Sequence, residues 1–136
     1  MKMTEVVAAV IVGEGDNEGQ YLISQRLKES KLGHCWEFPG GKIEPGETQA
    51  QCAVRECQEE IGVEIEVLEL IRDIPFEYPF GKLMLHFWKC RLLSGIPRPI
   101  YCRDVRWVRP EELKDYQFPE ADREIIREIS QSKERV

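Results

Sequence analysis

Apolar residues follow one another in short runs along the first third of the chain, and these runs predict strands. Residues 6–12 form a continuous run of valine, isoleucine and alanine, the pattern of a strand that is buried on both faces. Residues 21–26 come after a polar, glycine-rich turn and are expected to form a hairpin with the first strand. Residues 35–39 mix aromatic and apolar side chains directly before a glycine pair, which indicates a short strand that enters a tight loop.

The middle of the chain predicts a longer antiparallel pair of strands. Residues 63–74 mix valine, leucine and isoleucine with glutamate at near-alternation, and Pro75 is expected to end this half-exposed strand. Residues 83–92 form the partner strand, after a hairpin turn at 79–82. A last short strand is expected at 105–108.

Two amphipathic helices are predicted. Thr48 and Gln51 have the spacing of a capping box and Gly62 provides a C-terminal stop, so the first helix is expected to run from about Thr48 to Ile61. The second begins within residues 118–122 and buries isoleucines on one face. Strands on both sides of a central helix, with a second helix at the end, predict an α/β sandwich in which a mixed sheet lies between helical layers.

Length and composition limit the possible functions. The 136 residues, 42% of them hydrophobic, are expected to form one globular domain, 1–136. With 19 basic and 25 acidic residues the formal charge is −6, which argues against binding a nucleic acid polymer but tolerates a small metal-chelated nucleotide. The five cysteines lack the short paired spacings of a zinc site and favour reduced thiols. We expect a cytoplasmic protein without a membrane span, either a monomer or a homodimer.

Glycine and acid are concentrated in residues 40–62. A Gly-Gly pair and a Pro-Gly pair predict a tight loop just before the first helix. On that helix Glu56, Glu59 and Glu60 are spaced so that their carboxylates share one face, where like charges repel. A divalent cation such as Mg²⁺ would relieve this repulsion, because oxygen ligands from carboxylates and substrate phosphates are its usual partners. A merely solvated acidic face is the alternative.

The spacing of these residues resembles the Nudix box, the motif of hydrolases that act on nucleoside diphosphates linked to another group. The matching positions are Gly41, Glu47, Arg55, Glu56, Glu59, Glu60 and Gly62. Cys57 departs from the pattern, because the family usually has a larger aliphatic residue there. Outside residues 41–63 the resemblance continues more loosely toward the MutT-like branch, which includes pyrophosphohydrolases of oxidised dGTP and of CTP.

The resemblance implies a Nudix-type α/β/α sandwich and a chemistry. It implies hydrolysis of a nucleoside triphosphate to a nucleoside monophosphate and pyrophosphate, dependent on Mg²⁺ with Mn²⁺ as a substitute, for sanitation of the nucleotide pool. Metal ligands would be Glu56, Glu59, Glu60 and the carbonyl of Gly41. Glu56 would also be the leading general base, and Glu47 and Arg55 would orient the set. Arg55 lies four residues before Glu59 and can also pair with Glu56 or a loop carboxylate.

Substrate contacts are also implied by the resemblance. Arg26 would face the phosphates, the alternative being a surface charge, and Glu37 and Phe38 would line the base pocket, with core packing as the alternative for Phe38. Lys42 beside the glycine pair is a further substrate-binding candidate. Residues 27–34 are expected to form a flexible loop over the site.

Three more positions have expectations of their own. Asp122 corresponds to the residue that reads the base edge in MutT-like enzymes, with helix capping as the alternative. In its ionised form it would accept hydrogen bonds from cytosine, guanine or 8-oxoguanine. Tyr101 stands six residues before Trp107, where many relatives have another metal-binding glutamate; Asp104 is the nearest acid. His86 is expected to be a half-buried strand residue, the alternative being a base or a ligand.

Two alternatives to this function stay open at the level of sequence. The chain could act on another diphosphate-linked nucleotide, such as ADP-ribose, a nucleotide sugar or a dinucleoside polyphosphate, because the motif reads only the diphosphate and its metal. It could also be a nucleotide-binding module that kept the motif without turnover. In each case the expected partner is a small-molecule nucleotide.

Overall fold

The computed structural model describes residues 3–131, which form one sheet with a helix on each side. The strands are β1 (Thr4–Val12), β2 (Tyr21–Gln25), β3 (Trp36–Glu37), β4 (Gly40–Lys42), β5 (Glu64–Tyr78), β6 (Gly81–Ser94) and β7 (Asp104–Val108). The helices are α1 (Gln49–Ile61) and α2 (Arg123–Gln131). Three short 3₁₀ helices complete the set: η1 (Gly15–Asn17), η2 (Pro110–Asp115) and η3 (Glu120–Asp122).

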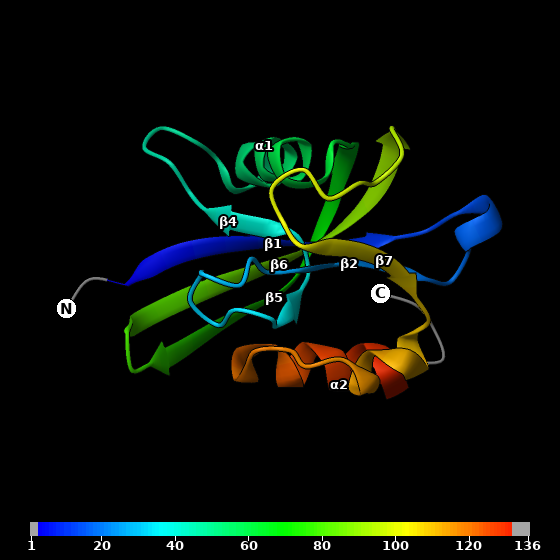
Figure 1. Cartoon of the computed structure of the whole chain (residues 1–136). Coiled ribbons are helices and arrows are strands. Elements are labelled where there is room, and N and C mark those ends of the chain that lie inside the picture. Colours follow the sequence, from blue (N-terminus) through cyan, green and yellow to red (C-terminus); the bar gives the residue numbers. More distant parts are fainter. Residues whose placement is uncertain (1–2, 132–136) are drawn as a thin grey trace.

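The sheet is mixed, as the sequence predicted. Its main path runs β3-β2-β1-β6-β5, and β4 pairs with β1 while β7 pairs with β2. Among the strands of residues 3–131, β1 and β6 form the one parallel pair, with Val7 opposite His86, and the other pairs are antiparallel. In Figure 1, α1 lies above the sheet and α2 below it, so the sheet forms the middle layer of a sandwich.

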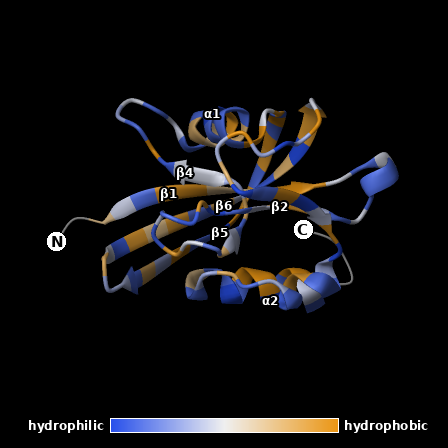
Figure 2. Cartoon of the chain, viewed as in Figure 1, coloured by the Kyte–Doolittle hydropathy of each residue, from blue (hydrophilic) through white to orange (hydrophobic). Residues whose placement is uncertain are grey.

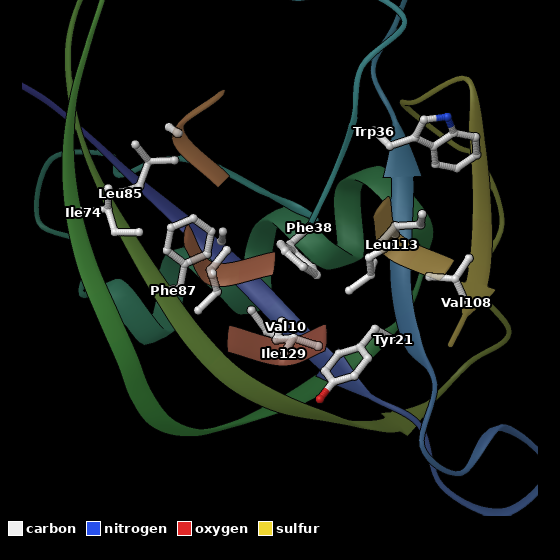
Figure 3. Close-up of a cluster of buried hydrophobic side chains, with 14 of the residues drawn as sticks. Val10, Tyr21, Trp36, Phe38, Ile74, Leu85, Phe87, Val108, Leu113 and Ile129 are labelled. Atoms are coloured by element: carbon white, nitrogen blue, oxygen red, sulfur yellow. The ribbon is translucent and has the colours of Figure 1, made fainter. Parts of the chain in front are cut away.

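Each face of the sheet has its own apolar core, because side chains alternate along β1. Val7, Ala9 and Ile11 pack toward α1, whereas Ala8 and Val10 join the cluster on the α2 side. Helix α2 buries Ile125 and Ile129 against the sheet, and its Glu124 and Glu128 pair with Arg72 of β5; Figure 2 shows the mixed hydropathy of this helix. Figure 3 shows the α2-side cluster, which is rich in aromatic rings.

Helix α1 begins and ends where the sequence predicted. The Thr48 side chain accepts a hydrogen bond from the Gln51 backbone N–H, and the Gln51 side chain accepts one from that of Thr48, so the capping box is complete. Gly62 ends the helix with φ 70°, and its N–H donates to the Gln58 carbonyl. Of the described residues, none belongs to a helix long and apolar enough to span a membrane.

The prediction that Pro75 ends the strand is wrong. Strand β5 continues to Tyr78, and Pro75 pairs with Met84 of β6. The strand tolerates proline because β5 is the outermost strand of the sheet, so the missing N–H is on the side without a neighbouring strand. The hairpin turn at Pro79 is confirmed, with Tyr78 opposite Gly81.

His86 is more buried than predicted, with 6% of its surface exposed. Its Nδ1 lies 2.6 Å from Asp73 Oδ1 and its Nε2 lies 3.0 Å from Glu5 Oε1. These carboxylates come from the two strands that flank β6, so they cover the ring on both sides. His86 therefore links three strands through polar contacts.

Candidate active site

A pocket of about 380 Å³ opens on the α2 side of the sheet and extends toward α1. Its walls come from β1, β4, the start of β6 and the loop of residues 27–35. Predicted site residues that line it are Arg26, Glu37, Phe38, Gly41, Lys42, Glu60 and Asp122. The remaining ones, Glu47, Arg55, Glu56 and Glu59, lie beside it on α1 and on the loop that leads into α1. The pocket thus brings together residues from both ends of the chain.

The path of residues 36–42 positions the floor of this pocket. β3 pairs with β2, and the chain then crosses so that β4 pairs with β1, with Gly41 opposite Val7. A Cβ atom on Gly41 would collide with the carboxyl group of Glu56, so only glycine lets this carboxyl group rest against the loop backbone. The contact brings Glu56 to the edge of the pocket.

Arg55 organises the acidic residues that lie outside the pocket. Its Nε and Nη2 donate to the two oxygens of Glu47, at 2.7 and 3.0 Å, and its Nη1 donates to Glu59 at 3.1 Å. It also lies 3.6 Å from Glu56 Oε1 and donates to the Lys42 carbonyl. The hydrogen bonds from Arg55 are the main reason that the pKa of Glu47 is lowered to about 2. The predicted pairing of Arg55 with helix and loop carboxylates is confirmed.

Two carboxyl groups of α1, those of Glu56 and Glu60, have pKa values shifted in the opposite direction. Burial raises the pKa of Glu56 to about 7, with Arg55 opposing and Glu59 adding to the rise. Burial also raises the pKa of Glu60 to about 9, and the charges of Glu37 and Glu56 add to it. Glu60 Oε1 is buried without a hydrogen-bond partner in the described part of the chain. Such an oxygen is available to a cation or to a water molecule.

These residues fit a divalent cation. The unpartnered Glu60 oxygen, the Glu56 carboxyl group on the bare backbone of Gly41 and the Gly41 carbonyl are all hard oxygen donors. Across residues 3–131, no three acidic, histidine or cysteine side chains converge as a preformed metal cluster. A Mg²⁺-type site agrees with this, since Mg²⁺ keeps several waters and takes substrate phosphate oxygens. Glu59 is the most exposed of the three helix glutamates.

Arg26 connects the pocket floor to the 27–35 loop. Its Nη1 lies 2.9 Å from Glu37 Oε1, and its Nε donates to the Lys31 carbonyl at 2.7 Å. Burial raises the pKa of Glu37, while Arg26 lowers it. Arg26 is therefore a half-buried cation at the pocket wall. Its guanidinium group is engaged on both sides.

Phe38 takes part in the core as well as in the pocket. Only 2% of it is exposed, and its ring lies 5.5 Å from that of Phe118 and 6.3 Å from that of Phe87. Figure 3 shows its ring within the apolar cluster. Phe38 therefore packs in the core, as the alternative interpretation expected. The same residue also lines the pocket.

Asp122 is buried in the pocket wall, with 3% of its surface exposed. Burial raises its pKa to about 8, the charge of Glu37 adds to this and Arg26 opposes it. This raised pKa favours the neutral acid, whereas the interpretation from sequence assumed an ionised carboxylate. Among residues 3–131 no backbone N–H of α2 donates to this side chain, which argues against the capping role.

Some pocket residues were not predicted from the sequence. Lys31 and Leu32 of the 27–35 loop and Tyr78, Phe80 and Lys82 of the β5–β6 hairpin also line the pocket. The aromatic character of residues 76–80 was a signal, but the pattern alone does not bring this hairpin next to the start of α2. The Tyr78 hydroxyl makes that connection by accepting a hydrogen bond from the Ala121 N–H at 3.0 Å.

Tyr101 and Asp104 do not join the acidic residues of the site through their side chains. Tyr101 is 66% exposed, and its backbone N–H donates to the Glu60 carbonyl at the end of α1. Asp104 accepts a hydrogen bond from the Val105 N–H and lies near Arg106. The loop before β7 therefore supports the end of α1 mainly through its backbone.

Known proteins are similar to this chain in sequence and in fold. A CTP pyrophosphohydrolase of Escherichia coli (strain K12) is 38% identical over 122 residues, which cover 90% of this chain and 87% of the relative. An 8-oxo-dGTP diphosphatase of the same organism is 30% identical over 129 residues, covering 95% and 98%. The solution structure of the E. coli ORF135 protein superposes with a TM-score of 0.76 at 37% identity, covering 93% of this chain and 88% of that one.

The family model of the NUDIX domain matches residues 7–128, which include the Gly41 loop, all of α1 and Asp122. The glutamates of α1, Arg55 and all pocket-lining residues except Thr4 and Val6 thus lie within the matched region. The chain belongs to the Nudix family and is a hydrolase of phosphorus-containing acid anhydrides.

Proposed function

We propose that this enzyme hydrolyses a nucleoside triphosphate to the nucleoside monophosphate and pyrophosphate, with 8-oxo-dGTP or a CTP-type nucleotide as substrate. One observation carries this proposal. A single pocket has metal-type oxygen donors at Glu60 and Gly41, a cation at Arg26 and a buried polar reader at Asp122. Those are the groups needed for a metal-bound phosphate chain and a base. The relatives named above, which act on CTP and 8-oxo-dGTP by their names, support the substrate class.

The proposed ligands of the divalent cation are Glu56, Glu60 and the Gly41 carbonyl, with Glu59 as the outer member of the helix face. When bound, the cation would neutralise phosphate oxygens and so favour attack by water. Mg²⁺ is the ion we propose, and Mn²⁺ is a substitute because it accepts the same oxygen ligands. Arg55, held by Glu47, keeps Glu59 and Glu56 in place from the outer side.

Glu56 is the proposed proton acceptor for the attacking water. Burial raises the pKa of Glu56 to about 7 in the metal-free chain, and a bound cation would lower it again, so the assignment rests on the position of this carboxyl group. Gly41 leaves room for the carboxyl group, and Arg55 restrains it from the other side. These contacts fix the direction of the carboxyl group toward the pocket edge.

Arg26 and Lys42 are the proposed cations for the substrate phosphates. Both line the pocket, and Arg26 has the planar fork that suits phosphate oxygens. Arg26 is held now by Glu37 and by the Lys31 carbonyl, so a phosphate group would take over one of these contacts. Glu37 then remains near Asp122, whose pKa it raises.

Asp122 is the proposed reader of the base edge. As a neutral acid it offers one O–H donor and one acceptor, which complement the amine and ring nitrogen of cytosine or the carbonyl and ring N–H of guanine. As an anion it offers only acceptors, which suit the ring N–H and the amine of guanine. The donors and acceptors that Asp122 offers to a base therefore depend on its protonation.

The experiment that tests this function is a panel of substrates with Mg²⁺. We expect the highest kcat/KM on 8-oxo-dGTP or dCTP among the canonical and oxidised nucleoside triphosphates, ADP-ribose, a nucleotide sugar and dinucleoside polyphosphates. A higher kcat/KM on one of the latter three classes would contradict the triphosphate assignment. Binding of all nucleotides without turnover would contradict the assignment of a nucleotide pyrophosphohydrolase.

We further propose that residues 1–136 act as one domain in the cytoplasm, as a monomer or a homodimer, with a free nucleotide rather than a nucleic acid polymer as partner. The family match over residues 7–128 supports the single domain. The five cysteines are all free, which suits a reducing compartment.

A further inference from the structure

Residues 27–35 form a compact loop whose ends meet. The Arg26 N–H donates to the Cys35 carbonyl at 2.9 Å, and three turns inside the loop are closed by the N–H groups of Ser30, Gly33 and Cys35. The sequence predicted a flexible loop here, yet the structure shows an internally hydrogen-bonded one. Loops with close ends and their own internal packing are frequently functional.

Two residues of this loop adopt a left-handed backbone conformation that side chains disfavour. Leu32 has φ 59° and His34 has φ 72°. Leu32 lines the pocket and packs against the α2-side core, and the Gln25 side chain donates to the His34 carbonyl at 3.1 Å. Strained residues persist where the surroundings hold them, and they gather at ligand sites. The loop thus has a defined internal conformation beside the pocket.

Lys31 is the point at which this loop touches the opposite rim of the pocket. Its ammonium nitrogen lies 4.8 Å from the centre of the Phe80 ring, at the tip of the β5–β6 hairpin. Within residues 3–131, Lys31 forms no salt bridge, so this contact is its attachment to the hairpin. A cation above an aromatic ring at an exposed site is a weak attraction, so the contact can open and close.

Phe80 is connected in turn to the base end of the pocket. Its ring stacks on that of Tyr78, with centroids 5.0 Å apart and planes 7° from parallel. The Tyr78 hydroxyl accepts from the N–H of Ala121, the neighbour of Asp122. Lys31, Phe80 and Tyr78 therefore form one wall of the pocket that ends beside Asp122.

We propose that Lys31 and Phe80 form a clasp that joins the 27–35 loop to the β5–β6 hairpin and encloses the base of the bound nucleotide. The proposal rests on the proposed function, because it takes the occupant of the pocket to be a nucleotide. Lys31 and Phe80 are then positioning residues: they retain the planar base but contact neither the metal ligands nor the reacting phosphate. Their loss should weaken binding of ligands that carry a base and leave ligands without a base unaffected.

The test compares ligands with and without a base. Dissociation constants are measured by calorimetry, with Mg²⁺, for the α,β-methylene analogues of dCTP and dGTP, which resist hydrolysis at that bond, and for tripolyphosphate. Lys31→Met and Phe80→Leu should each weaken binding of the better nucleotide analogue by about threefold to tenfold. The affinity of the double variant for the analogue should equal that of the single variant with the lower affinity, because both substitutions remove the same contact. Affinity for tripolyphosphate should stay within about twofold.

Two further variants separate the clasp from general effects of charge. Lys28→Met removes a charge from the same loop outside the pocket and should bind as the unchanged chain does. Lys31→Arg keeps a cation for the ring and should restore binding. Hydrogen exchange of residues 27–35 should slow when the analogue binds, and Phe80→Leu should remove this protection.

Unchanged nucleotide affinity in both Lys31→Met and Phe80→Leu would overturn the clasp, as would an equal loss for tripolyphosphate. The assay is independent of turnover. An inactive chain that binds the analogues through Lys31 and Phe80 would refute the proposed function alone, whereas an active chain indifferent to both substitutions would refute the clasp alone.

Discussion

Arg55 donates two hydrogen bonds to Glu47 through one edge of its guanidinium group, with Nε 2.7 Å from Oε2 and Nη2 3.0 Å from Oε1. The remaining nitrogen, Nη1, is thereby turned toward Glu59 and Glu56 on its own helix. Glu47 in turn accepts a hydrogen bond from the Glu44 N–H, which ties it to the loop before α1. The pair therefore connects the glycine-rich loop to the acidic face of α1.

Removing Glu47 should free Arg55 to neutralise Glu56. We expect Glu47→Ala to lower kcat by about tenfold to a hundredfold, as is typical for partners that orient metal ligands, with little change in KM. Glu44→Ala is the matched control, because Glu44 is exposed on the same loop and lies 3.5 Å from Arg55. Steady-state kinetics give kcat and KM for the two variants, and equal values in both would refute the orienting role of Glu47.

Binding of Mg²⁺ should release protons near neutral pH. The pKa of Glu60 is raised to about 9 and that of Glu56 to about 7, so the free enzyme holds protons that a cation must displace. We expect about one to two protons released per ion at pH 7, and an affinity that increases between pH 6 and pH 9. Calorimetry in two buffers of different ionisation enthalpy measures this release. Glu60→Gln should remove most of this proton release. Glu64→Gln, at the exposed start of β5, is the control and should leave it unchanged.

The same shifts predict how stability depends on pH. The folded-state pKa values of Glu56 and Glu60 lie above the ordinary value of 4.5, so folding favours their neutral forms. Their effect is a loss of stability as pH rises through the range from about 4.5 to 9. Mg²⁺ should therefore raise the melting temperature, and more so at pH 8.5 than at pH 6. An equal or absent shift at the two pH values would contradict the placement of the cation.

Base preference should change as Asp122 ionises around pH 8. Below that pH the neutral acid accepts several bases, whereas above it the carboxylate favours guanine, which presents two donors, over thymine, which presents one donor between two carbonyls. The ratio of kcat/KM for 8-oxo-dGTP to that for dTTP should therefore increase from pH 7 to pH 9. Taking a ratio cancels effects of pH on the metal site.

Asp122→Asn keeps the neutral shape and should hold this ratio constant with pH. Asp122→Ala should erode the preference among bases without abolishing hydrolysis. A ratio that does not change with pH in the unchanged enzyme, or that still increases with pH in Asp122→Asn, would show that Asp122 does not read the base.

The local features of the site were predictable because they depend on spacing along one helix. The cap at Thr48, the stop at Gly62 and the pairing of Arg55 with its neighbours all follow from residues a few positions apart. The mixed sheet with helical layers also followed from the order of the periodic segments.

The remaining features depend on contacts between distant segments. Pro75 is tolerated because β5 is an edge strand, which the local pattern does not specify. The protonation of Asp122 depends on burial next to Glu37, 85 positions away in the sequence. The contact between Lys31 and Phe80 requires a loop and a hairpin that only the folded chain brings together.

The central claim is that this pocket cleaves a nucleoside triphosphate between its α and β phosphorus atoms with Glu56 as proton acceptor. The most direct measurement is phosphorus NMR of the products formed from dCTP and 8-oxo-dGTP with Mg²⁺, for the unchanged enzyme and for Glu56→Gln. We predict nucleoside monophosphate and pyrophosphate in equal amounts, and a rate at least about a hundredfold lower in the variant, which should melt as a folded protein. Release of nucleoside diphosphate and orthophosphate, or an unchanged rate in Glu56→Gln, would contradict this account.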